Sequence, residues 1–177
     1  MTKREVYHSR GSAIIRDLIL GGQDGLVNVL GIVLAVAVAT QSKYIILISG
    51  LAATFAESIS MAAVAYTSVQ AGKEYYQKKR NKISEEFEHP IRDALVVGLA
   101  AIVGSFVPLI AFFFLPVSIA IWTTLGISTL TLFVSGAIKA NYTGTSPFKS
   151  GLEMAIVGMT AAIAGYFIGK ALGAIPA

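Results

Sequence analysis

Five long apolar stretches occupy most of this chain of 177 residues. They cover approximately residues 13–40, 44–69, 94–115, 117–138 and 152–172. A helix needs about 20 apolar residues to cross the hydrocarbon core of a bilayer, and each stretch reaches that length. Strands in the same positions would leave open sheet edges in lipid. The sequence therefore predicts an all-α integral membrane protein, with five transmembrane helices in a single domain that spans residues 1–177.

The composition agrees with a membrane protein and narrows its chemistry. Hydrophobic residues make up 55% of the chain and charged residues only 14%, which is too apolar for a soluble domain of this length. The chain has no cysteine, so disulfides, thiolate metal sites and cysteine nucleophiles are excluded. The net charge of +4 does not indicate a nucleic-acid partner, because the basic residues lie beside the apolar stretches.

The distribution of lysine and arginine predicts the orientation. With a cytoplasmic N-terminus, twelve basic residues lie inside and only Lys43 and Lys170 lie outside, in agreement with the positive-inside rule. The twelve are Lys3, Arg4, Arg10, Arg16, Lys73, Lys78, Lys79, Arg80, Lys82, Arg92, Lys139 and Lys149. The polar connector at about residues 70–92 is then cytoplasmic. Five spans cannot form two equal inverted halves, so a two-fold pathway would require a second copy of the chain.

Two carboxyl groups lie deep inside apolar stretches, where ionisable groups are costly and usually functional. Asp24 follows Gly21 and Gly22 in a glycine cluster that could loosen the helix, and Asn28 lies one turn further along on the same face. Together they offer oxygen ligands to a cation. The alternative is that Asp24 only bonds a neighbouring helix.

Glu57 and Met61 are four residues apart and share a helix face. Oxygen ligands alone suit Mg²⁺ or Ca²⁺, whereas an added soft sulfur favours a transition metal such as Fe²⁺. A carboxyl group must lose its proton to bind a metal, so metal binding releases protons and exchange of protons for metal becomes feasible. The alternatives are a structural hydrogen bond for Glu57 and gap filling in a helix interface for Met61.

Two further features receive weaker interpretations. Gly158, Gly165, Gly169 and Gly173 form a small-residue stripe that lets helices approach closely, within one chain or between two. Acidic residues of the connector, with one histidine, could capture metal at the cytoplasmic mouth or could simply form a solvated face. These residues are Glu74, Glu85, Glu86, Glu88 and His89. No catalytic motif is present, and we do not expect an enzyme.

Several short motifs resemble the vacuolar iron transporter family, in the right order along nearly the whole chain. They are Gly22-Gln23-Asp24-Gly25-Leu26-Val27, Ser58-Ile59-Ser60-Met61-Ala62-Ala63, Tyr66-Thr67-Ser68-Val69-Gln70, and the region from Lys139-Ala140 through Ser146-Pro147 to Ser150-Gly151-Leu152-Glu153-Met154. The resemblance implies a homodimer that moves Fe²⁺, and often Mn²⁺, out of the cytoplasm in exchange for protons. It also implies a pathway at the dimer interface, with the family's intramembrane aspartate at Asp24 and its methionine at Met61.

The chain departs from the family pattern in two places. The family often has a glutamate about eight residues before the methionine, where this chain has Ala53, and Glu57 lies one turn closer. Many members also carry a long glutamate-rich domain between helices two and three, where this chain has a connector of only about 23 residues. The resemblance is therefore to the membrane core alone.

These observations together predict an exporter of divalent transition metal that exchanges Fe²⁺ or Mn²⁺ for protons. Its partners would be metal ions, protons, membrane lipid and a second copy of the chain, with no resident cofactor and no nucleic acid. It would lie in the cell membrane of a prokaryote or in a vacuolar-type membrane of a eukaryote. The alternatives are a Mn²⁺-selective member, a facilitator without proton coupling, and a membrane scaffold that transports nothing.

Overall fold

The computed structural model describes residues 3–79 and 87–173, with side chains from residue 13 onward. Its five helices are α1 (Lys3–Thr40), α2 (Lys43–Lys78), α3 (Pro90–Phe114), α4 (Val117–Thr143) and α5 (Pro147–Gly173). Each has a segment long and apolar enough to cross a membrane, and the described residues include no strand. The predicted all-α membrane fold is confirmed.

Local sequence explains where the helices stop. Between α1 and α2 the chain turns at Gln41, which has a positive φ of 53°. Pro116 separates α3 from α4, because the residue before a proline is driven out of the helical region. Gly144 ends α4 with a φ of 68°, a conformation that glycine adopts without a steric penalty. Pro147 then begins α5, where its missing N–H is not needed.

The helices extend beyond the apolar stretches from which they were predicted. α2 continues to Lys78, so the first part of the connector expected at residues 70–92 is helical. α1 passes through Gly21–Gly25 as continuous helix, and the loosening expected there is absent. α3 likewise continues through Pro108. In this region α1 and α3 pack closely, because a Cβ on Gly104 would lie 2.1 Å from the Gly22 carbonyl oxygen.

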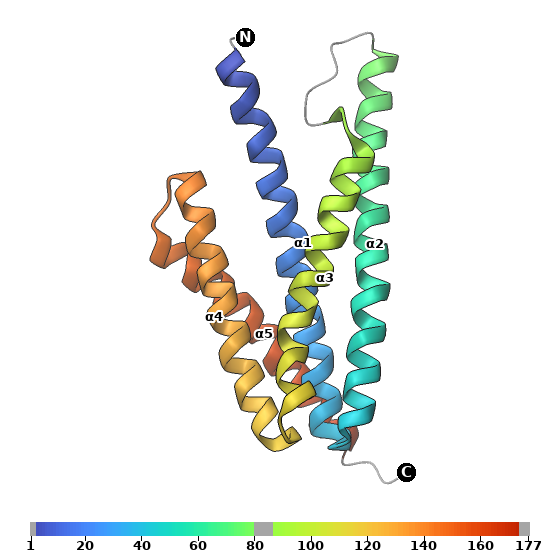
Figure 1. Cartoon of the computed structure of the whole chain (residues 1–177), viewed down its shortest axis with the longest axis vertical. Coiled ribbons are helices and arrows are strands. Elements are labelled where there is room, and N and C mark those ends of the chain that lie inside the picture. Colours follow the sequence, from blue (N-terminus) through green and yellow to red (C-terminus); the bar gives the residue numbers. More distant parts are fainter. Residues whose placement is uncertain (1–2, 80–86, 174–177) are drawn as a thin grey trace.

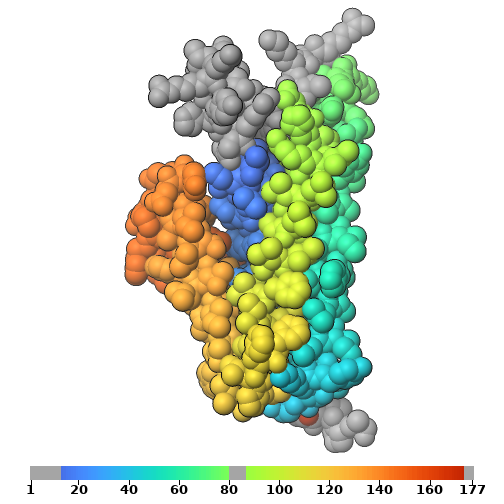
Figure 2. All heavy atoms as spheres, in the orientation of Figure 1, coloured from blue at the N-terminus to red at the C-terminus, as the bar shows by residue number. Residues whose placement is uncertain are grey.

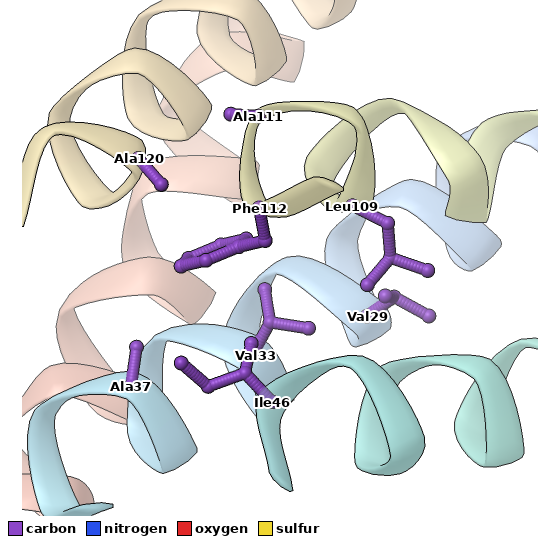
Figure 3. Packing of buried hydrophobic residues seen from close by; sticks show 8 residues of the cluster. All are labelled: Val29, Val33, Ala37, Ile46, Leu109, Ala111, Phe112 and Ala120. Carbon is purple, nitrogen blue, oxygen red and sulfur yellow. The ribbon is translucent and has the colours of Figure 1, made fainter. Parts of the chain in front are cut away.

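α1 is the central element and contacts each of the other four helices (Figure 1). Its N-terminal end lies at the same end of the molecule as the end of α2 and the start of α3. Figure 3 shows how the buried core is built beside it, with Phe112 of α3 pointing toward Val33 of α1. Ile46 of α2 and Ala120 of α4 belong to the same cluster.

The glycine stripe of α5 is used inside the chain. A Cβ on Gly165 would lie 2.2 Å from the Gly31 carbonyl oxygen, and one on Gly169 would lie 2.2 Å from the Ala35 carbonyl oxygen. The two backbones of α1 and α5 can approach this closely only because side chains are missing. The structural interpretation of the stripe is confirmed, and the stripe no longer supports a contact between two copies.

A hollow separates α4 from the pair formed by α1 and α3 (Figure 2). It measures about 540 Å³ and is lined mainly by apolar side chains, such as Leu18, Val103 and Ile138. Large apolar residues are exposed elsewhere as well, including Phe114 at 81% and Trp122 at 76%. Such a surface suits lipid. The hollow contains none of the residues predicted to bind metal.

Candidate metal site

Three of the four predicted metal ligands come together where α1 and α2 face each other. The Asn28 Nδ2 donates a hydrogen bond to Glu57 Oε1. The Asp24 carboxyl group lies close enough to the same Glu57 carboxyl group for the two to interact electrostatically. The residues come from two helices and lie near the middle of their apolar stretches. We call Asp24, Asn28 and Glu57 the central cluster.

The local structure of each helix accounts for this arrangement. Asp24 and Asn28 are one turn apart, so both side chains project from the same face of α1. On α2, the neighbouring hydroxyl groups are used by their own helix, because Thr54 Oγ1 donates to the Gly50 carbonyl at 2.8 Å and Ser58 Oγ donates to the Thr54 carbonyl at 2.6 Å. Glu57 is therefore the group on this part of α2 that reaches toward α1.

The central cluster lies at the surface of the chain. Asn28 is exposed, and Asp24 and Glu57 are only half-buried. Asp24 also lines a hollow of about 200 Å³, together with Gln23 of α1 and Val157 of α5. Polar groups at this depth are costly when they face lipid. The arrangement can bind a cation, and a protein surface that covers it would remove the exposure to lipid.

Met61, the fourth predicted ligand, lines a different hollow. It lies one turn from Glu57 along α2, and its hollow of about 200 Å³ also contains Leu20, Asp17 and Asp93. The hollow beside Asp24 does not include Met61. The sequence predicted that Met61 and Glu57 share a metal site, whereas the structure places Met61 beside Asp17 and Asp93, which were not predicted as site residues.

The overlooked residues are Asp17 of α1 and Asp93 of α3, which are 3% and 2% exposed. Each follows an arginine and forms an ion pair with it, at 3.1 Å for Arg16 and 2.6 Å for Arg92. In the sequence, the two arginines count as cytoplasmic charges, and the acids beside them lie outside the residues predicted to bind metal. The signal was an Arg-Asp doublet near the start of both the first and the third apolar stretch.

The connector residues predicted to capture metal do not form a metal site among the residues that the structure describes. Glu74 is exposed and accepts a hydrogen bond from Gln70 at 2.8 Å. His89 Nε2 lies 3.7 Å from Glu88 Oε2, while Glu85 and Glu86 lie outside the described residues. Within residues 13–79 and 87–173, no three or more His, Cys, Asp or Glu side chains are grouped so that they could hold a metal ion. Metal capture by the connector stays a prediction.

Comparison of the sequence with known proteins shows which family this chain belongs to. The sequence model of the VIT family matches residues 15–89 and 81–170, which include the central cluster and parts of all five helices. This chain belongs to the VIT family. Vacuolar iron transporter 1 of Tulipa gesneriana is 24% identical, in an alignment that covers 99% of this chain and 94% of the tulip protein. Vacuolar iron transporter 1 of Arabidopsis thaliana is 22% identical, over 92% of this chain and 88% of that protein.

A third VIT relative is vacuolar iron transporter homolog 1 of Arabidopsis thaliana, 28% identical over 94% of this chain and 86% of that protein. The alignment with the tulip protein runs to 231 positions, more than the 177 residues of this chain. The two matched segments of the family model meet at residues 81–89, between α2 and α3.

Proposed function

We propose that this VIT family member exports Fe²⁺, and also Mn²⁺, from the cytoplasm in exchange for protons. The observation that supports the proposal is the central cluster, in which Asp24 and Asn28 of α1 meet Glu57 of α2 near the middle of the membrane-spanning segments. Membership of a family whose named relatives include vacuolar iron transporters adds the substrate class.

The chemistry of the central cluster suits exchange. Two adjacent carboxylates repel each other unless a proton or a cation lies between them. A divalent metal ion that binds both must displace any proton they hold, and protons that return must displace the metal. The amide oxygen of Asn28 is a further neutral ligand for a hard or borderline cation. Asp24 and Glu57 would then carry metal in one direction and protons in the other.

We infer that the working unit is a homodimer. The central cluster faces outward from one chain, since Asn28 is exposed and the two carboxyl groups are half-buried. A second copy related by a two-fold axis would cover this face and bring a second central cluster to the first. Four carboxylates would then be available to the metal, in a site enclosed by protein and surrounded by lipid.

The proposed direction of transport depends on orientation. The N-terminal end of α1, the end of α2 and the start of α3 lie together (Figure 1), and this end carries most of the lysine and arginine residues. The positive-inside rule assigns this end to the cytoplasm. The membrane would be the cell membrane in a prokaryote or a vacuolar-type membrane in a eukaryote.

Reconstitution into liposomes with an imposed pH gradient tests the proposal. Fe²⁺, Mn²⁺, Co²⁺, Ni²⁺ and Zn²⁺ should be compared side by side, with metal flux followed by an indicator dye and proton flux by a pH dye. We expect Fe²⁺ and Mn²⁺ to move against the proton flow, and Asp24→Asn to abolish both fluxes. Metal flux without proton movement would establish a facilitator, and no flux of any metal would leave the scaffold interpretation.

A further inference from the structure

A second pair of carboxyl groups lies between α1 and α3, apart from the central cluster. Asp17 and Asp93 are 3% and 2% exposed, and they are close enough to interact electrostatically. Two buried acids of like charge repel each other, so their proximity requires compensation. The arginine beside each acid provides part of it, through the Arg16–Asp17 and Arg92–Asp93 ion pairs.

Each arginine occupies only one oxygen of its carboxylate. Arg16 donates two hydrogen bonds to Asp17, and both go to Oδ1. Arg92 likewise donates two hydrogen bonds to Asp93 Oδ1. The buried Oδ2 atoms of both acids have no hydrogen-bond partner among the described residues. An unpaired buried carboxylate oxygen is costly. The arginines orient the two acids and leave one oxygen of each available for another ligand.

The two acids open into one shared hollow that also contains a thioether. Asp17, Asp93 and Met61 all line the hollow of about 200 Å³, and Phe87 lines it at the connector end. Asp17 precedes Asp24 by seven residues, which is about 10 Å along an α-helix. The hollow therefore lies between the connector end of the molecule and the central cluster.

We propose that Asp17, Asp93 and Met61 form a second binding site for a divalent transition metal ion, where metal is held before it reaches the central cluster. This proposal relies on the proposed function for the direction of travel. The ligand set contains two carboxylate oxygens and one soft sulfur, a combination that favours a transition metal over Mg²⁺ or Ca²⁺.

The arginines limit the affinity of this site without preventing binding. The Arg16 side chain is 50% exposed and the Arg92 side chain 32% exposed, whereas the acids are almost fully buried. Solvent therefore screens the two positive charges more than the two negative ones. An entry site must release its ion to the next site, so moderate affinity suits its role.

Equilibrium dialysis of Co²⁺ against the purified full chain in mild detergent tests the second site. Asp24→Asn disables the central cluster, and this variant should still bind about one Co²⁺ per chain through the two carboxylates and the thioether. Adding Asp93→Asn to it should weaken the remaining binding at least tenfold. Asp93→Asn alone is the matched control and should retain the Co²⁺ bound by the central cluster.

Met61→Leu leaves the Arg16–Asp17 and Arg92–Asp93 ion pairs in place. It therefore still tests the second site if the Asp93→Asn chain misfolds. In the Asp24→Asn background it should remove any thioether signature from the Co²⁺ absorption spectrum and weaken Co²⁺ more than Mn²⁺. The second site is overturned if Asp24→Asn alone eliminates Co²⁺ binding, or if binding that survives Asp24→Asn is unchanged by both further variants. Liposomes that transport no metal would contradict the proposed function while leaving Co²⁺ binding dependent on Asp93 intact.

Discussion

At the scale of single residues, Asp24 is the group on which the proposed function most depends. It lies close enough to Glu57 to interact with it electrostatically, and Asn28 donates a hydrogen bond to the same Glu57. The contacts alone are compatible with a structural role, in which three polar groups satisfy one another between two helices. The functional role requires the charge of Asp24, and a substitution that changes charge but not shape separates the two.

Asp24→Asn should reduce metal flux in liposomes at least tenfold while the protein still folds and inserts. Asparagine keeps the size of the side chain and much of its hydrogen bonding, but it cannot bind a cation as a carboxylate does or exchange a proton. Asp24→Glu is the matched control, because it keeps the charge and the adjoining hollow has space for one more methylene. We expect it to retain part of the flux. Full flux in Asp24→Asn would make the aspartate structural.

Met61→Leu should reduce Fe²⁺ flux more than Mn²⁺ flux, by about threefold or more. Leucine keeps the bulk and apolar character of methionine and removes only the sulfur. Mn²⁺ is better served by oxygen ligands, so it should depend less on the thioether. Fluxes of both ions are compared in the same liposome preparation, with Val64→Leu on the same wall as the control for a change of shape. Equal losses for the two ions would show that Met61 only forms part of the wall.

At the scale of the helices, glycine determines how closely α1 meets α3 and α5. Backbone carbonyl groups of α1 lie where a Cβ would be on Gly104 of α3 and on Gly165 of α5, at 2.1 Å and 2.2 Å. The helix that carries Asp24 is therefore held on two sides by contacts that allow no side chain. The position of the central cluster depends on this close packing.

Gly165→Ala should destabilise the protein by about 2 kcal/mol, within the range that overpacking usually costs. The new methyl group would meet the Gly31 carbonyl oxygen, which belongs to helical backbone and cannot move aside easily. Gly126→Ala makes the same change on α4, where nothing lies within 4 Å of the added Cβ. The control should be neutral or slightly more stable, since alanine favours helix more than glycine does.

Thermal unfolding in detergent, followed by size-exclusion chromatography of heated samples, compares these two glycine variants directly. The expected result is a clear fall in midpoint temperature for Gly165→Ala and none for Gly126→Ala. Similar midpoints for the two variants would mean that α5 can shift away from α1 at little cost.

At the scale of the whole molecule, the orientation of the chain can be checked with reporters. A reporter fused after Ala177 should read as outside and one inserted at Lys78–Lys82 should read as inside, because twelve of the fourteen basic residues lie on the proposed cytoplasmic side. A permeability control distinguishes intact cells from leaky ones. The reverse pattern would place the connector and the second metal site on the outer side, and it would reverse the proposed direction of transport.

The assembly state is the second prediction at this scale. Native mass measurement in mild detergent should find two chains, since the central cluster is exposed on one chain and would otherwise face lipid. Asn28→Cys should form an intermolecular disulfide if this face is the interface, and the chain has no native cysteine to interfere. Exposed Ile163→Cys on α5 is the control and should not cross-link. A monomer that transports metal would require a pathway inside one chain.

The sequence by itself determined the five helices, because the length of an apolar stretch is compared directly with the thickness of the bilayer. It also identified Asp24 and Glu57, since a carboxyl group inside an apolar stretch is visible without any knowledge of packing. The lengths of the helices were underestimated, because a polar sequence such as Ala71–Lys78 can continue a helix into water.

Only the tertiary structure decided which polar residues meet. Asn28 and Glu57 are 29 positions apart in the sequence and pair across two helices. Helical periodicity predicts only which residues share a face of one helix, so it does not predict this pair. In the sequence, Asp17 and Asp93 each follow an arginine and carry no other signal, and only their burial between α1 and α3 made them a candidate site. The glycine stripe was visible in the sequence, but its partner was not, because a small-residue stripe specifies close approach and leaves open which helix approaches.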